Sequence, residues 1–309
     1  MLDTTIQVGD PVGHRGVVIV PLFPRSRPRA AYVTLEEALP LGLRVTEVDA
    51  AGSVPELRVA NPLESKVLLY DGEELLGAKQ NRILNVTVLV PEASETIVLV
   101  SCVEEGRWHA RSAAFAPAAH TAYPELRRRK AERLSVAPLE LGLAQAAVWE
   151  EVRAKSVRMR VDSETGAQAD IYRSREDDLA ALRRAFPLQP GQSGALLALG
   201  DRLCLDYVSR PDAFARLYPK LLDGYLLDAL EALDGKPRGE TAPFIEALDG
   251  AARSRRPSAR LGEDVRLRGP GVVGSGLELD GELVQLCAFT SDGGGAEAPT
   301  RIMRPSRRA

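Results

Sequence analysis

Apolar and polar residues alternate in short runs over the first 109 residues of the chain. An apolar run at 16–23 ends at Pro24, and residues 43–48 and 56–62 alternate with a period of two. Two more alternating runs follow at 85–90 and 96–103. Short strands separated by frequent turns, without a strand–helix–strand rhythm, are typical of antiparallel sheets. The pattern predicts a sandwich or a barrel-like sheet here.

A helical period appears after residue 110. Apolar residues recur every three or four positions at Leu141, Ala144, Val148 and Val152. Similar patterns predict helices at 139–156, 174–186, 211–235 and 243–254, and Ser174 is a candidate N-cap. Two hairpins are predicted at 194–208 and 265–289. The predicted fold class is α+β, with a β-rich antiparallel sandwich or barrel-like N-terminal part and an α+β C-terminal part.

The change of pattern divides the chain into three parts. Residues 1–115 are predicted to form a β-rich domain that contains the sequence GAKQNR. Residues 116–290 are predicted to form an α+β part, which could share one core with the first because no long linker separates them. Residues 291–309 are expected to be a flexible tail.

The runs at 85–90 and 96–103 are predicted to pair as a hairpin with a five-residue loop at 91–95. In this register Leu84 lies opposite Cys102, on an apolar face. The next pair on that face is Arg82 opposite Glu104. A buried guanidinium needs a partner, and Glu104 is the partner that this register supplies.

Polar side chains are dense between residues 71 and 82. The segment holds three acids, a lysine, two amides and an arginine, and Gly72 and Gly77 free its backbone. A donor-rich segment between two strands is a candidate site for a phosphate or a polyol. Under the alternative interpretation, the Arg82–Glu104 pair is a buried strut and the acids form a solvated turn. The glycine spacing matches neither a Walker loop nor a dinucleotide fingerprint.

The overall composition argues against several classes of protein. The chain has 309 residues, a formal charge of −3 and 45% apolar residues, without the basic excess of a dedicated nucleic-acid or membrane binder. The basic cluster at 127–130 is interpreted as solvated surface. No apolar run approaches the roughly 20 residues of a membrane span, and the first residues do not resemble a signal peptide. Three dispersed cysteines indicate buried, inert thiols, and a cytoplasmic location is expected.

Metal and nucleophile chemistry receives little support from the sequence. The three histidines, His14, His109 and His120, lack metal-binding spacing. A divalent cation such as Mg²⁺ is conceivable only at a group of carboxylates, namely Asp71, Glu73, Glu74 and Glu104. No serine or cysteine has an adjacent base in the sequence. Asp206, at the end of an apolar run, is more typical of a cap or turn than of a site.

The stretch GEELLGAKQNRILNVTVLVP, followed by VSCVEEGRW, resembles the ARG and rhodanese-phosphatase-superfamily-associated protein domain, a family of unknown function. Later stretches such as AQAAVWEEV and DSETGAQADIY are similar in order, so the resemblance covers roughly residues 15–290. It implies a link to ADP-ribosylglycohydrolases and to ADP-ribose or NAD metabolism. His14 and His120 lie outside the resemblance. The polar core that the resemblance implies comprises Glu73, Glu74, Lys79, Gln80, Asn81, Arg82, Glu104 and Trp108.

Two functional hypotheses follow. In the first, the protein binds or acts on an ADP-ribose-like or other phosphorylated ligand. Glu74 and Glu104 would be the catalytic bases, Lys79 and Arg82 would hold phosphate, and Glu73, Gln80, Asn81 and Trp108 would complete the ligand site. In the second, the chain is a non-catalytic module that binds a partner protein or forms a homo-oligomer. Nucleic-acid binding through the arginine-rich segments is a weaker third hypothesis.

Overall fold

The computed structural model describes residues 2–50, 52–136, 141–236 and 238–291, which form three β-sheets and surrounding helices. The largest sheet has nine antiparallel strands: β1 (Ile6–Val8), β2 (Val12–His14), β3 (Val17–Pro24), β13 (Gly194–Leu199), β14 (Arg202–Val208), β15 (Ala252–Pro257), β16 (Glu263–Gly269), β17 (Val272–Leu279) and β18 (Glu282–Thr290). Their order is β1-β3-β13-β14-β18-β17-β16-β15, and β2 pairs with β3.

Two smaller sheets form most of the N-terminal part. One has six strands: β5 (Arg44–Glu47), β6 (Glu56–Asn61), β8 (Glu73–Gly77), β9 (Arg82–Leu84), β11 (Ser94–Cys102) and β12 (Phe115–Thr121). The other has three: β4 (Val33–Thr34), β7 (Val67–Leu69) and β10 (Val88–Val90). Their inward side chains, such as Val59, Val67, Leu84 and Val100, share one apolar core. The predicted fold class is confirmed: the structure is β-rich α+β, mostly antiparallel, with a curled half-barrel sheet.

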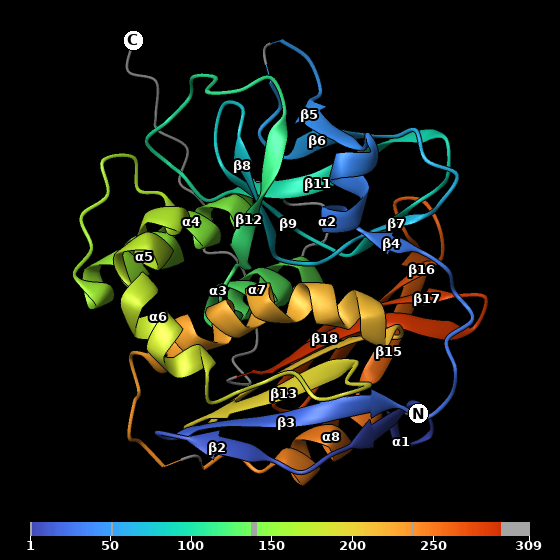
Figure 1. The fold of residues 1–309 in the computed structure, drawn as a ribbon, viewed down its shortest axis with the longest axis vertical. Coiled ribbons are helices and arrows are strands. Elements are labelled where there is room, and N and C mark those ends of the chain that lie inside the picture. The colour runs from blue at the N-terminus through green and yellow to red at the C-terminus, as the bar shows by residue number, and fades with distance from the viewer. Residues whose placement is uncertain (1, 51, 137–140, 237, 292–309) are drawn as a thin grey trace, which may run out of the picture.

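Some helices cover the two faces of the large sheet, and others lie beside the N-terminal strands. They are α1 (Leu2–Thr5), α2 (Leu35–Ala38), the 3-10 helix η1 (Leu39–Leu41), α3 (Pro124–Val136), α4 (Leu141–Met159), α5 (Gln168–Ser174), α6 (Glu176–Arg183), α7 (Pro211–Ala229) and α8 (Thr241–Asp249). Figure 1 shows α3 and α7 between the large sheet and the N-terminal strands, with α8 on the sheet's other face. Within the described residues, no helix combines the length and apolar character needed to cross a bilayer.

The central core lies around α7. Phe214, Leu221 and Leu226 of this helix pack with residues of both halves of the chain, including Ile83 of β9 and Cys287 of β18. α7 begins with a proline at its first turn, where a missing N–H costs nothing, and it continues through Pro219 without interruption. Because α7 is buried along most of its length, tertiary packing compensates for this internal proline.

Residues near the start of the chain belong to the same sheet as residues after 194. Val20 of β3 lies opposite Leu196 of β13, and β3 runs along the full length of β13. The proposed boundary near residue 115 therefore separates segments that are hydrogen-bonded to each other in one sheet. Of the proposed tail, residues 292–309 lie outside the described residues.

The predicted register of the hairpin is wrong. Val100 pairs with Leu84. Arg82 pairs with Cys102, which lies two residues before Glu104, the predicted partner of Arg82. β10 was predicted to pair with β11, but it pairs with β7. The first part of β11 pairs with β6. A shift of two residues keeps every side chain on its original face, so alternation of apolar and polar positions cannot distinguish the two registers.

The predicted helices and hairpins are largely confirmed, but their ends differ. The two hairpins at β13–β14 and β17–β18 form as expected. Ser174 was expected to cap a helix that begins there, yet it is the last residue of α5. The next helix, α6, begins at Glu176, and Arg175 occupies the N-cap position without a side-chain hydrogen bond. The three acids of its first turn complement the positive end of the helix dipole instead.

Candidate functional site

Arg82 is the centre of the predicted site, and its side chain is completely buried. It donates a hydrogen bond to Oε1 of Gln80 at 2.8 Å and also contacts the thiol of Cys102. The nearest carboxylate is that of Glu47, 3.9 Å away. Its Nε and Nη2 atoms have no hydrogen-bond partner among the described residues. The predicted pairing of Arg82 with Glu104 is therefore wrong, although both side chains are buried as expected.

Glu104 is held by three other donors. Its Oε2 atom accepts hydrogen bonds from Arg107 at 2.6 Å and from the backbone N–H of Asn81 at 3.1 Å. Its Oε1 atom accepts one from the hydroxyl of Thr165 at 2.9 Å. Burial alone would raise the pKa of Glu104, but these hydrogen bonds outweigh burial and lower it. Glu104 is therefore a poor proton acceptor, and its position is that of a structural anion.

Trp108 marks the surface above Arg82. Its side chain is 46% exposed, which is unusual for a large aromatic residue. The guanidinium carbon of Arg82 lies 5.4 Å from the ring centroid, and Nζ of Lys79 lies 5.5 Å from it. Lys79 is oriented by a hydrogen bond from Nζ to the carbonyl of Ala50 at 2.7 Å. Arg111, with 59% of its side chain exposed, extends from the same region toward Glu104. We call Lys79, Trp108 and Arg111, with Arg82 beneath them, the Trp108 surface.

Glu73 and Glu74 do not join this surface. Leu75 of β8 lies opposite Arg82 and Glu74 lies opposite Ile83, so Glu74 and Arg82 point to opposite faces of the sheet. Glu74 contacts His120 and Gln168. Glu73 instead accepts hydrogen bonds from the backbone N–H of Tyr70 at 2.9 Å and from Lys220 at 3.3 Å. The structure thus separates the predicted site into two regions.

The four carboxylates considered for Mg²⁺ are also separated. Each has its own basic partner: Asp71 pairs with Lys130, Glu73 with Lys220, Glu74 with His120 and Glu104 with Arg107. Among the described residues, no group of three or more His, Cys, Asp or Glu side chains could hold a metal ion. Three of these carboxylates form internal ion pairs and Glu74 hydrogen-bonds to His120, an arrangement unlike a metal centre.

Sequence reasoning missed a buried ionic cluster at the middle of the molecule. Asp206 on β14 accepts two hydrogen bonds from Arg127, at 2.6 and 2.9 Å, and one each from the hydroxyls of Tyr70 and Tyr225, at 2.6 and 2.7 Å. Burial acts to raise the pKa of Asp206, but Arg127 outweighs this effect and lowers it. Asp206 is therefore an anion that ties α3, α7 and the loop before β8 to the large sheet.

The interpretation of residues 127–130 as solvated surface is wrong for two of them. Arg127 and Lys130 are completely buried, and Nζ of Lys130 donates to Asp71 at 2.7 Å. Burial lowers the pKa of Lys130, although Asp71 opposes that change. The helical spacing contained a signal, because Tyr123, Arg127, Lys130 and Leu134 recur at intervals of three or four and share one buried face.

His120 is the other residue that the sequence did not single out. Its side chain is only 10% exposed, and its Nε2 atom lies 2.8 Å from Oε2 of Glu74. The ring stacks on Tyr172, with 3.7 Å between the centroids. His14 and His109, in contrast, are exposed. Nothing in the spacing of these histidines distinguishes His120, because its partners come from distant parts of the chain.

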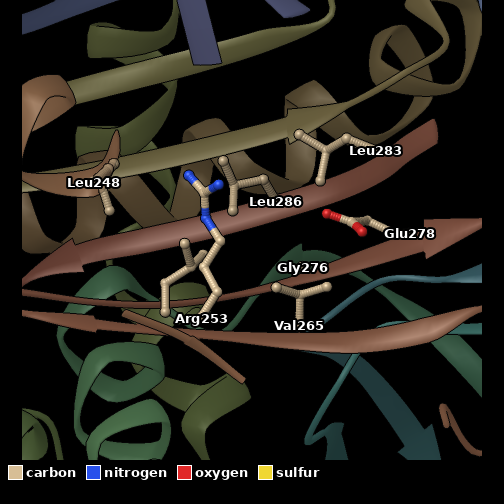
Figure 2. Close-up of a pocket in the computed structure, with 8 residues that line it drawn as sticks. Leu248, Arg253, Val265, Gly276, Glu278, Leu283 and Leu286 are labelled. Atoms are coloured by element: carbon tan, nitrogen blue, oxygen red, sulfur yellow. The ribbon is translucent and has the colours of Figure 1, made fainter. Parts of the chain in front are cut away.

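Two surface hollows lie elsewhere, and none of the predicted site residues lines either of them. Figure 2 shows the one beneath α8, where the side chain of Arg253 extends among leucines and Glu278 lies to one side. The second is lined by residues of α3 and of the large sheet, including Glu125, Arg128 and Arg202.

The comparison with protein families places this arrangement in a family. A family model described as the ARG and Rhodanese-Phosphatase-superfamily-associated Protein domain matches residues 5–289. The chain belongs to this family. The match covers all three sheets and includes the Trp108 surface and the Asp206 cluster, so the resemblance seen in the sequence is confirmed. Neither a curated protein nor a solved structure matches the chain.

Proposed function

We propose that the protein binds a phosphorylated sugar or nucleotide ligand, of the ADP-ribose type, at the Trp108 surface. The observation that carries this proposal is an exposed tryptophan flanked by cations. A purine or another flat group can stack on the ring of Trp108, because every base has a π-face. The cations of Lys79 and Arg111 would then attract the phosphates.

Arg82 supports the same interpretation from below the ring. Two of its nitrogens are buried without a hydrogen-bond partner among the described residues, an expensive arrangement in a folded protein. Its positive charge lies under Trp108 and adds to the potential that an anionic ligand meets. Glu104 has the role of holding Arg107 and the strand end in place, so the proposal concerns binding and assigns Glu104 no proton transfer.

The family of the chain and its expected location also bear on this proposal. The family is described by its association with other protein classes. The link to ADP-ribose or NAD metabolism that the sequence resemblance implies suggests which phosphorylated ligands to test first. The proposal also includes a cytoplasmic location. Three cysteines that are buried and free, in a protein of this length, support that location.

Calorimetric titration tests the proposal directly. ADP-ribose, NAD, AMP and ribose 5-phosphate would be titrated into the native protein and into Trp108→Ala and Lys79→Ala. Loss of one stacked base is expected to weaken binding by about 1–3 kcal/mol. Arg173→Ala is a control, because Arg173 is an exposed cation on α5 that pairs with Asp170 and is not among the residues of this surface. Native protein that binds none of the four compounds would contradict the proposal.

A second candidate is a non-catalytic module that binds a partner protein or another copy of the chain. It is favoured by the way in which Glu104, Arg107 and Asn81 satisfy one another, since such a network stiffens a strand end without any ligand. In that case Trp108 would be the aromatic anchor of a protein interface. Light scattering distinguishes the two candidates. If Trp108 anchors an interface between copies of the chain, the native protein should have the molar mass of an oligomer, and Trp108→Ala should have that of a monomer.

A further inference from the structure

β15 is an edge strand of the nine-stranded sheet. Among the described residues it pairs with β16 alone, along its whole length from Ala252 to Pro257. Five of its six residues are exposed, and the sixth, Arg253, is partly buried. An exposed strand edge offers unpaired backbone N–H and C=O groups to an extended chain that approaches it.

The register at the end of β15 shows which backbone groups point outward. Ser258 donates its backbone N–H to the carbonyl of Gly262 at 3.0 Å, so these two residues form a hydrogen-bonded pair. Hydrogen-bonded and non-hydrogen-bonded pairs alternate along an antiparallel ladder, and the register of β15 and β16 is continuous. The even-numbered residues of β15 therefore bond to β16. The N–H and C=O groups of Arg253 and Arg255 point away from the sheet.

The side chains of the same two arginines share one face of the sheet. Arg253 lies opposite Leu267, and Arg255 lies opposite Val265. Both of these apolar partners line the hollow beneath α8, together with Leu248 of that helix (Figure 2). The two arginines are thus about 7 Å apart along the open edge, on the face that α8 covers.

Both guanidinium groups retain N–H donors for a further acceptor. Arg255 binds Glu278 through Nε and Nη2, at 3.1 and 3.3 Å, and 40% of its side chain is exposed. The Nε atom of Arg253 has no hydrogen-bond partner among the described residues, and its ion pair with Asp249 is long, at 3.7 Å. A guanidinium has five N–H donors, so each arginine can bind an additional carboxylate.

The charge of the β15–β16 hairpin indicates the kind of partner. Residues 252–268 include six arginines and two acids, in a chain whose formal net charge is −3. A second copy of β15 would place arginine opposite arginine at this edge, and like charges directly opposite each other destabilise a strand pair. An acidic strand would place carboxylates there and form ion pairs. The edge therefore fits an acidic partner better than another copy of the chain.

We propose that β15 binds an extended acidic segment of a partner protein, which joins the large sheet as an antiparallel strand. The residues opposite Arg253 and Arg255 would be acids two positions apart, so that each carboxylate lies on the same face as its arginine. Backbone hydrogen bonds to these two residues would supply affinity, and the spacing of the acids would supply specificity. This edge shares no residue with the Trp108 surface, and the inference does not depend on ligand binding there.

Fluorescence anisotropy with labelled peptides tests the proposal. The probe is a short capped peptide of alternating glutamate and threonine, and its charge control has lysine in place of glutamate. Two further versions carry N-methyl groups, either on the glutamate amides, which would face β15, or on the threonine amides, which would face solvent. The unmodified and threonine-methylated peptides should bind saturably, and the other two should not.

Two results of this titration would overturn the proposal. The first is a glutamate peptide that does not bind at millimolar concentration. The second is binding that methylation of the glutamate amides leaves unchanged, because this result would show attraction between charges without addition of a strand.

Variants of Arg255 separate the contribution of the charge from that of the backbone. Arg255→Gln keeps the outward N–H and should weaken binding about two- to fivefold, the range expected for an exposed ion pair. Arg255→Pro also removes the outward N–H, which takes no part in the ladder with β16, so binding should be lost while the melting temperature shows a folded protein. Arg173→Gln, at an exposed arginine that pairs with Asp170, is the control and should bind like the native protein. Equal affinities of Arg255→Pro and Arg255→Gln would contradict strand addition.

Amide hydrogen exchange followed by NMR provides a test that needs no variant. In the free protein, the amides of Arg253 and Arg255 should exchange faster than those of Ser254 and Arg256, which bond to β16. Saturation with the glutamate peptide should slow exchange at Arg253 and Arg255 and leave the other two amides unchanged. Bound peptide that does not slow exchange at Arg253 and Arg255 would overturn the proposal.

Discussion

At the scale of single residues, the positions of charges were easier to predict than their partners. Arg82 and Glu104 were expected to be buried, and both are. Their expected contact fails because the strand register differs by two residues, which leaves the pattern of faces unchanged. Arg107 was not expected to be Glu104's partner, because it lies beyond the predicted ladder in a segment where no periodicity applies.

The role of Glu104 predicts a specific pH dependence. Its pKa in the folded protein is lowered, so it binds fewer protons there than in the unfolded chain. Its stabilisation is therefore complete above the unfolded pKa of about 4.3 and is lost as the pH falls through the folded value. Glu104→Gln should reduce the free energy of unfolding by about 3 kcal/mol at pH 7, since it breaks a buried ion pair. The difference from the native protein should shrink in acid.

Urea denaturation over a series of pH values measures this effect. Glu105→Gln is the matched control, because the adjacent Glu105 makes an exposed pair with Arg153 and should contribute little. A difference between native protein and Glu104→Gln that stays constant from pH 7 to pH 3 would show that the charge of Glu104 is not what stabilises the fold.

At the scale of secondary-structure elements, long periodic segments were predicted well and junctions were not. The hairpins β13–β14 and β17–β18 and the helix α7 appear where the alternation and the helical period place them. The association of β10 with β7 rather than β11 could not be predicted, because the residues that select a strand's partner lie in other elements. Asp206 was interpreted as a strand-end acid for the same reason: Arg127, Tyr70 and Tyr225, which donate hydrogen bonds to it, lie in three separate segments.

We expect that a conservative substitution in the Asp206 cluster lowers the free energy of unfolding strongly. Asp206→Asn removes the anion that balances the buried Arg127, so it should destabilise the fold by about 3–5 kcal/mol. Asp234→Asn is the control, because Asp234 pairs with Arg15 on the surface and should hardly change the melting temperature. Thermal unfolding followed by circular dichroism compares them, and equal melting temperatures for the two variants would refute a structural role for the cluster.

At the scale of the whole molecule, the division near residue 115 matches the change in sequence pattern. Strands on the two sides of this division are nevertheless hydrogen-bonded to each other. β3 pairs with β13, and the central core combines residues of both parts. Sequence patterns report local periodicity, and they carry no information on which distant strands become neighbours.

This connection predicts that residues 116–291 do not fold alone. Without β3, β13 would expose an unpaired edge and one face of the core would lose its cover. The fragment should show no cooperative unfolding transition in calorimetry, whereas residues 1–291 should show one. A fragment that unfolds cooperatively with native-like secondary structure would establish residues 116–290 as an independent domain.

Stacking of a phosphorylated ligand on Trp108 can be followed by tryptophan fluorescence. The chain has two tryptophans, so Trp149→Phe leaves Trp108 as the only one and makes its fluorescence a specific reporter. Titration of this variant with ADP-ribose should quench or shift the emission along a saturable curve, and adding Lys79→Ala should move that curve to higher concentrations. Emission that stays constant up to millimolar ADP-ribose, NAD and AMP would contradict the account.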